Sequence, residues 1–527
     1  MKHRTRIIAL LALAALLAGL TGCTQREGEG FTFSAAVVGK PATFDPALAA
    51  TEGEKMAALH LYENLMRLQQ GEDGMEVVSA LAESYERTDN PDGTETYVFH
   101  LRRGARWSDG KTVRAADVVY AWQHLAAEST GSPSAALLEM VVGYEEARHG
   151  NPDALQIYAR SNDTLEIVLQ RRCPYFLRVV CTAAATVPRR PDLPNRIGAA
   201  TNGPYTMGTY EDGVLTMTAS ETYYDAKRIG PDTIAIHYCE TAQEAASLLE
   251  DGTVDFACGV ADETVAEQEN WIPEPYPETV VLIVNQMSQQ LDNEPLRQAL
   301  SLAIDRTELA ALAGAATHSA AEGLVPAGIA ASAGGAFRTP EGIHIDNSDY
   351  EGSCQRAREL LESAGVTRLT DVTLFCPDDE TSRAVAEAIC RSWQEKLGLT
   401  VQRQSMADEE FTEALTGGAF QMAIIPCTAD RNDAEELLRM WQSGHSENYG
   451  QFHSTAFDML LRVAAASSST EARDACLSDA ERLLVEQGYA IPLYCANRVI
   501  FLRNGLTGLT SDGFGVFRFD TVRQKAG

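Results

Sequence analysis

The sequence predicts an α/β fold built on mixed sheets. Segments with strand periodicity and segments with helix periodicity alternate along the whole chain, and no internal repeat is present. Tyr97, Phe99 and Leu101 recur at every second position, which is typical of a half-buried strand. Leu296, Leu300 and neighbouring apolar residues recur at helical spacing instead. This mixture favours α/β lobes over an all-helical or all-strand architecture.

Segment 97–122 is expected to form a strand, a tight turn and a helix. Ser-Asp-Gly at 108–110 is a turn signal, and apolar residues return at helical spacing after Ala115. With Arg114 at the N-cap, Asp117 is the third helical residue, where a carboxylate favours the positive end of the helix.

In the second half of the chain, residues 271–277 carry proline at every second position from 273, which favours an extended connector. A continuous run of β-branched and apolar residues at 279–284 predicts a buried strand. We place the best domain boundary between them. Residues 295–309 predict one helix, and the Ala/Gly/Ser-rich segment 314–337 predicts a long loop.

Composition excludes several classes of function. The net charge of −31 argues against nucleic acid as a partner, because phosphates would be repelled. The patterns of hydrolase nucleophiles, zinc proteases and nucleotide-binding loops do not occur, so no catalytic residue, metal site or cofactor is expected. Ten cysteines follow residue 23, without a Cys-x-x-Cys pair, and we interpret them as buried free thiols.

The N-terminus predicts export. Lys2, Arg4 and Arg6 precede an apolar stretch at 7–20, which spans about 21 Å and is too short for a membrane core of about 30 Å. Residues 1–22 therefore indicate a signal peptide. Its end, Leu-Thr-Gly-Cys23, resembles a bacterial lipobox, which implies a lipid on Cys23 and a tether at 23–30; the alternative is a simple secretory signal.

Three further stretches carry a resemblance to a known family. They resemble segments of the extracytoplasmic solute-binding proteins that serve peptide and nickel ABC importers. The stretches are Arg106-Trp-Ser-Asp-Gly110 followed by Ala-x-Asp117-Val-Val-Tyr-x-Trp, the turn Gly203-Pro-Tyr205, and the helix at 296–306. Within that family the chain is most similar to the oligopeptide-binding branch. Arg114 stands where the family has Ser or Thr, so a side-chain helix cap worth about 1 kcal/mol is absent.

The resemblance implies a two-lobed periplasmic-binding-protein fold with mixed sheets, an extra subdomain and a ligand cleft between the lobes. It assigns residues 31–62, 170–278 and 495–527 to lobe I, residues 63–169 to the subdomain, and residues 279–494 to lobe II. Lobe closure by hinge rotation is expected.

The resemblance also implies a binding site after the apolar segment that begins at Met422. In oligopeptide-binding proteins a similar segment supplies the Asp that pairs with the α-ammonium of the peptide, and by resemblance this residue is Asp430. Its alternative role is a helix or turn cap. The expected neighbours on that wall are Pro426, Cys427, Thr428 and Asn432, and those on the opposite wall are Ala50, Thr51 and Glu52. Arg431 replaces an aromatic residue of the family, and Pro426 lacks an N–H that could bind the ligand backbone.

We therefore expect a monomeric, lipid-anchored oligopeptide-binding protein at the outer face of the cytoplasmic membrane or in the periplasm. It would bind peptides by their backbone and N-terminal amine and deliver them to a permease driven by ATPase subunits. Three alternatives stay open. They are the same fold with a dipeptide, nickel chelate or haem ligand, a surface receptor for signalling peptides, and a lipid-anchored hydrolase.

Overall fold

The computed structural model describes residues 30–71, 74–189, 199–260, 271–332, 334–339, 342–429, 431–467 and 469–525. The predicted signal peptide, Cys23 and Asp430 lie outside these ranges. Among the described residues, no helix combines the length and the apolar character that a membrane span requires.

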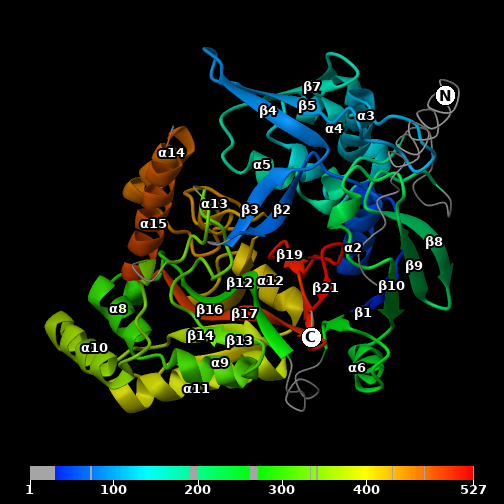
Figure 1. Cartoon of the computed structure of the whole chain (residues 1–527). Coiled ribbons are helices and arrows are strands. Elements are labelled where there is room, and N and C mark those ends of the chain that lie inside the picture. Colours follow the sequence, from blue (N-terminus) through cyan, green and yellow to red (C-terminus); the bar gives the residue numbers. More distant parts are fainter. Residues whose placement is uncertain are drawn as a thin grey trace, which may run out of the picture.

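One mixed sheet of eleven strands runs through both lobes, in the order β15-β14-β16-β12-β17-β11-β1-β10-β9-β8, with β13 paired to β17. Figure 1 shows β8, β9 and β10 on the right and β14, β16, β12 and β17 at the lower left. The strands are β1 (Thr32–Val38), β8 (Tyr205–Glu211), β9 (Val214–Ala219), β10 (Thr233–Cys239), β11 (Phe256–Cys258), β12 (Trp271–Val284), β13 (His318–Ala320), β14 (Thr373–Pro377), β15 (Gln402–Met406), β16 (Met422–Thr428) and β17 (Ala490–Leu502).

The strands β12 and β17 are the longest in this sheet and join its two halves. The expected connector at 271–277 and the expected strand at 279–284 form the single strand β12, so the prediction of a separate connector is wrong. The proline half pairs with β17 alone, because β16 joins β12 only from Glu278 onward. Proline is tolerated there because an edge strand does not need every N–H. The register shifts between Pro275 and Thr279, where β16 joins β12.

The predicted strand, turn and helix in 97–122 are confirmed. The strand β5 (Glu95–Leu101) lies in a four-stranded antiparallel sheet, and α3 (Ala115–Ala126) follows the turn. The Arg114 N–H donates to Asp117 Oδ2 at 2.8 Å, so the carboxylate supports the helix start that lacks a Ser or Thr cap. The other strands of this region are β2 (Met66–Gly71), β3 (Gly74–Ser79), β4 (Ala82–Asp89), β6 (Ile157–Ala159) and β7 (Thr164–Leu169).

The predicted helix at 295–309 is wrong in its length, because the chain forms two helices there. The helix α8 (Glu294–Leu302) ends before Ala303, and α9 (Arg306–Gly314) begins after Asp305. The Asp305 carboxylate accepts from the Thr307 and Glu308 N–H groups, each at 3.1 Å, and this cap starts a new helix. The apolar periodicity continues across the break and conceals it.

The other α-helices of the described residues are distributed around the large sheet and the smaller sheets (Figure 1). They are α2 (Glu52–Leu61), α4 (Tyr144–Arg148), α5 (Phe176–Val179), α6 (Ala242–Glu250), α10 (Tyr350–Ala364), α11 (Glu380–Ser392), α12 (Asp408–Thr416), α13 (Ala434–Arg439), α14 (Thr455–Ala466) and α15 (Thr470–Glu486). Four short strands near the C-terminus form two two-stranded antiparallel sheets, in which β19 pairs with β20 and β18 pairs with β21. They are β18 (Leu506–Thr507), β19 (Thr510–Ser511), β20 (Phe517–Arg518) and β21 (Arg523–Gln524).

The apolar core is divided into separate clusters. One cluster is drawn from residues between 281 and 494, and a second from residues between 47 and 200. A third joins the first strand to the C-terminal segment, where Phe33 and Phe519 pack with ring centroids 4.9 Å apart. Ten cysteines are free thiols and most of them are buried, as predicted. The domain limits taken from the family resemblance stay a prediction.

The buried residue His60 gives the third cluster a pH-dependent stability. Its Nδ1 lies 2.6 Å from the Met56 carbonyl oxygen, and its Nε2 accepts from the Phe519 N–H at 2.8 Å, so the ring is neutral. Burial lowers the pKa of His60 from 6.5 to about 4. The unfolded chain therefore takes up a proton first as the pH falls, and the stability that is present above about pH 6.5 is lost toward pH 4.

We expect His60 to account for about 2 kcal/mol of lost unfolding free energy between about pH 7.5 and about pH 5. Urea unfolding of the wild type and of His60→Gln at both pH values measures this share, because glutamine does not titrate. An equal pH dependence in the two proteins would contradict the assignment.

Candidate functional site

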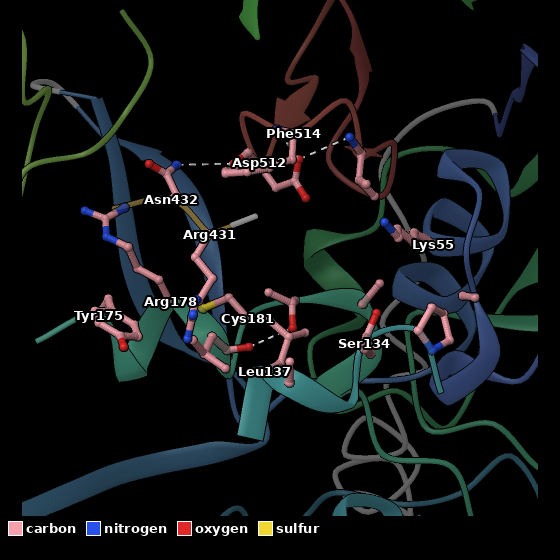
Figure 2. A pocket seen from close by; sticks show the side chains of 18 of the residues that line it. Lys55, Ser134, Leu137, Tyr175, Arg178, Cys181, Arg431, Asn432, Asp512 and Phe514 are labelled. Carbon is pink, nitrogen blue, oxygen red and sulfur yellow. Dashed lines mark hydrogen bonds between the residues drawn. The ribbon is translucent and has the colours of Figure 1, made fainter. Parts of the chain in front are cut away.

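A cavity of about 390 Å³ lies between the segments 49–68, 133–139, 175–184, 431–439 and 512–516. Figure 2 shows Arg178 and Arg431 on one side, Lys55 on the other, Asp512 and Phe514 above, and Leu137 below. The lining residues include Ala49, Ala50, Lys55, Leu68, Pro133, Ser134, Leu137, Glu139, Tyr175, Arg178, Cys181, Arg431, Asn432, Arg439, Asp512 and Phe514. Segments far apart in the sequence therefore form one concave, partly apolar site.

The start of α2 forms the lobe I wall. Glu54 is 2% exposed, and its carboxylate organises the loop before the helix. Its Oε1 accepts from the Ala42 and Thr43 N–H groups at 2.7 and 3.1 Å, and its Oε2 accepts from those of Ala50 and Thr51 at 2.9 Å each. Burial acts to raise the pKa of Glu54, but the four backbone hydrogen bonds outweigh it and lower the pKa overall.

Of the three lobe I residues predicted for the site, Ala50 lines the cavity. Thr51 is the N-cap of α2 and accepts from the Glu54 N–H at 3.3 Å. Glu52 forms an ion pair with Arg498 of β17, whose guanidinium lies 4.3 Å from the Tyr276 ring centroid. Thr51 and Glu52 thus have structural partners, and Glu52 connects lobe I to the crossing strands.

Among the described strands, β16 presents a free edge after Ala423. β14 pairs only with Met422 and Ala423, whereas β12 pairs along the whole of β16. The Ala429 N–H donates to the Pro277 carbonyl at 2.8 Å, so by alternation the backbone groups of Pro426 and Thr428 point away from β12. This position explains the proline, whose missing N–H removes no bond to β12.

The side chains of this edge divide between the two faces of the sheet. Pro426 and Thr428 are exposed, and Thr428 Oγ1 donates to Glu278 Oε2 at 2.8 Å. Cys427 points to the opposite face and is fully buried in the lobe II core. Its burial raises the pKa of the thiol to about 12, so it is a neutral apolar group.

Beyond the described part of β16, the chain reaches the cavity at Arg431 and Asn432. Asn432 Oδ1 accepts from the Ala330 N–H at 2.7 Å, and its Nδ2 lies 3.5 Å from the Asp512 carbonyl. Asn432 therefore holds the loop after β13 and the C-terminal hairpin at the cavity. Asp430, between Thr428 and Asn432, lies outside the described residues.

Arg431 links two parts of the molecule across the cavity. Its Nη1 lies 2.7 Å from Glu139, which precedes the subdomain helix α4, and its Nη2 lies 3.0 Å from Glu436 of α13. Its guanidinium also lies 5.5 Å from the Tyr175 ring centroid. From the sequence, Arg431 is notable only because it replaces an aromatic residue of the family. In the structure it forms ion pairs with Glu139 and with Glu436.

A buried ion cluster fixes the next turn of the chain. Arg473 of α15 binds Asp433 through two nitrogens, at 2.9 and 2.8 Å, and Glu435 at 2.7 Å. Asp433 also caps α13 by accepting from the Glu435 N–H at 2.9 Å. Arg473 Nη1 donates to Ser332 Oγ at 2.5 Å, which ties the loop after β13 to the same cluster. This cluster positions Arg431 and Asn432 from behind.

The cavity residues Tyr175, Arg178, Asp512 and Phe514 were not predicted from the sequence. Each lies in a segment without a distinctive motif, and only the folded chain brings 175–184 and 512–516 beside residue 432. Asp512 Oδ1 accepts from the Phe514 and Val516 N–H groups at 2.7 and 3.1 Å. Burial raises its pKa to about 6.

The chain is similar in sequence and in fold to several known proteins. The chain is 25% identical to the dipeptide-binding protein DppE of Bacillus subtilis, over 96% of each chain. It is 26% identical to the periplasmic murein peptide-binding protein MppA of Escherichia coli, over 86% of each chain. Among solved structures, the unliganded open form of MppA matches with a TM-score of 0.84 at 23% identity, covering 94% of this chain and 98% of that chain.

A second structure of Escherichia coli MppA gives a TM-score of 0.62 at 22% identity, covering 95% of this chain and 99% of that chain. Of these two structures, the unliganded open form gives the higher TM-score. The expected two-lobed α/β fold is confirmed.

The family model of the bacterial extracellular solute-binding proteins, family 5, matches residues 76–449. Its members are binding proteins, which agrees with the prediction that the chain is not an enzyme. The match covers more than half of the sequence, and the chain belongs to this family of extracellular solute-binding proteins.

Proposed function

We propose that this protein is the oligopeptide-binding component of an ABC importer. The observation that carries the proposal is the free edge of β16, whose outward backbone groups at Pro426 and Thr428 lie just before the cavity residues Arg431 and Asn432. An extended peptide can add to such an edge as a further strand through main-chain hydrogen bonds. Main-chain binding does not depend on side chains, which suits a ligand of variable sequence.

The proposal includes Asp430 as the partner of the peptide's α-ammonium group. An enclosed ammonium loses its water, and a fixed carboxylate replaces that hydration. Pro426, Cys427, Thr428 and Asn432 on one wall, and Ala50, Thr51 and Glu52 on the other, complete the proposed site. Among them, Ala50 and Asn432 have the support of lining the cavity.

We further propose that the mature chain is a monomer with a lipid on Cys23, held at the outer face of the cytoplasmic membrane or in the periplasm. Closure of the lobes around the peptide would prepare the protein for a permease and its ATPase subunits. The family membership and the exported relatives support this assignment.

Isothermal titration calorimetry with di- to hexapeptides tests the proposal. We expect saturable binding of several unrelated tri- to pentapeptides and weaker or absent binding of free amino acids. A second candidate, dipeptide binding, is favoured by the similarity to DppE, and a clear preference for dipeptides would support it. Absence of binding to all of these peptides would contradict both.

The variant Asp430→Ala is expected to weaken peptide binding by about 2–5 kcal/mol, because it leaves the enclosed ammonium without a counter-charge. Calorimetry with one tripeptide measures the loss. The control is Asp479→Ala, on the exposed face of α15, whose carboxylate pairs only with its helix neighbour Arg482 among the described residues. An unchanged affinity in Asp430→Ala would remove Asp430 from the site.

A further inference from the structure

The cavity carries positive charge in a strongly acidic protein. Lys55, Arg178, Arg431 and Arg439 line it, against the carboxylates of Glu139 and Asp512, although the whole chain has a net charge of −31. A cleft with low-dielectric walls concentrates the field of such charges. The site therefore differs in sign from the rest of the molecule.

Two of these cations are already neutralised by carboxylates. Arg431 binds Glu139 and Glu436, and Arg439 lies 3.5 Å from Glu436 and 3.8 Å from Glu139. The carboxylate of Asp512 binds backbone groups instead, because its Oδ1 accepts hydrogen bonds from two backbone N–H groups. Among the described residues, the cavity's own carboxylates form no ion pair with the other two cations.

Arg178 and Lys55 are those two cations. Within the described part of the chain, neither forms an ion pair with a carboxylate. Arg178 donates from Nη2 to the Ala331 carbonyl at 3.3 Å, and its Nη1 is buried with no hydrogen-bond partner among the described residues. Burial lowers the pKa of Arg178, although the carboxylates of Asp433 and Asp474 act to raise it. A buried donor without an acceptor is unfavourable, so a carboxylate that reaches this guanidinium gains binding energy.

The walls around these cations are apolar. Leu68, Leu137, Cys181 and Phe514 line the same cavity, which limits the water that can compete for the charges. Arg178 and Lys55 face it from opposite sides in Figure 2. A ligand group that fits this cavity has a short apolar part, which contacts the apolar residues, and a carboxylate, which contacts the cations. An acidic side chain and a peptide C-terminus both have this form.

From this arrangement we infer that the cavity binds a carboxylate of the enclosed peptide, with Arg178 as its main contact and Lys55 as a second positive charge. The inference rests on the proposed peptide-binding function and adds a preference for acidic ligands. Hydrogen bonds to charged groups contribute enough free energy for an affinity difference of about tenfold to hundredfold.

The test is calorimetry with a matched set of tripeptides. The set contains tri-alanine, tri-alanine amide, and tri-alanine with Glu or Gln at each position in turn. If the carboxylate comes from a side chain, one Glu peptide will bind about tenfold or more tighter than its Gln partner. If the carboxylate is that of the C-terminus, tri-alanine amide will bind about tenfold or more weaker than tri-alanine, and the Glu and Gln peptides will bind with equal affinity.

The variants Arg178→Gln and Lys55→Gln identify the residues. We expect Arg178→Gln to abolish the discrimination between the charged and the neutral peptide, whereas Lys55→Gln reduces this discrimination less. Arg178→Lys should restore part of it. Arg160→Gln, which removes an exposed charge that does not line the cavity, is the matched control.

Arg178 could instead have a purely structural role, through its bond to Ala331. In that case Arg178→Gln would lower the affinity for charged and neutral peptides equally. That result, or equal wild-type affinity for every charged and neutral pair, would overturn the inference but leave the proposed function intact. Absence of binding of every peptide to the wild type would overturn both.

Discussion

Arg473→Met is expected to lower the free energy of unfolding by about 3–5 kcal/mol, because it leaves buried carboxylates without their counter-charge. Arg473 is 1% exposed and binds Asp433 and Glu435 together, and Asp433 is itself 3% exposed. Methionine fills a similar volume, so the loss reports charge more than packing. Chemical denaturation measures it directly.

Arg482→Met on the same helix is the matched control. Arg482 is about half exposed and pairs with Asp479 and Glu486 at the surface, where ion pairs contribute less than about 1 kcal/mol. The two variants should therefore differ by several kcal/mol. Similar unfolding free energies would show that the buried cluster does not stabilise this part of lobe II.

Arg473→Met is also expected to weaken peptide binding, because the cluster holds Asn432 and the loop around Ser332. The loss should appear at temperatures where the variant is still folded. This separates misplacement of the site from global unfolding.

The second large effect is expected for Glu54→Gln. The carboxylate of Glu54 accepts four backbone N–H groups in the loop that carries Ala50. An amide can accept at one oxygen only, so two part-buried donors lose their acceptor. Each buried unsatisfied donor costs about 1–3 kcal/mol, and a part-buried one lies at the low end of this range. We expect the free energy of unfolding to fall by about 3 kcal/mol and peptide affinity to fall with it, because the lobe I wall loses its order.

Glu351→Gln is the control for this variant. Glu351 also lies in the first turn of a helix, but its side chain is 73% exposed and pairs with Lys396 at the surface. Because the pKa of Glu54 is lowered in the folded protein, its contribution is present at neutral pH and is lost as the pH falls through that pKa. The difference between wild type and Glu54→Gln should therefore shrink in acid. A constant difference would contradict the role of the charged form.

The elements predicted from local patterns agree with the structure where one period governs a segment. The strand and helix on either side of residue 110 are examples, because each has a strong apolar period and a clear start. The single helix expected at 295–309 failed because its apolar stripe continues across the Asp305 cap. The connector at 271–277 failed because proline content alone does not reveal that β17 supplies a partner strand.

Of the cavity-lining residues, the family motifs indicated Ala50 and Asn432 in advance, and their role in binding stays a prediction. Glu54 looks like any helix-starting glutamate, and its four backbone donors depend on a loop that closes only in the folded chain. Arg178 lies in a segment without periodicity or motif, and its place beside Arg431 arises from contacts between distant parts of the sequence. Such contacts leave no local signal.

The account's central claim is that the cleft encloses peptides by their backbone, and native mass spectrometry of the mature soluble chain from Thr24 tests it most directly. We expect spectra recorded before and after partial denaturation to reveal release of a mixture of short peptides. One defined peptide would instead favour the signalling receptor, and a metal chelate the nickel-type alternative. A protein that releases no ligand and also ignores added tri- to hexapeptides would contradict the claim.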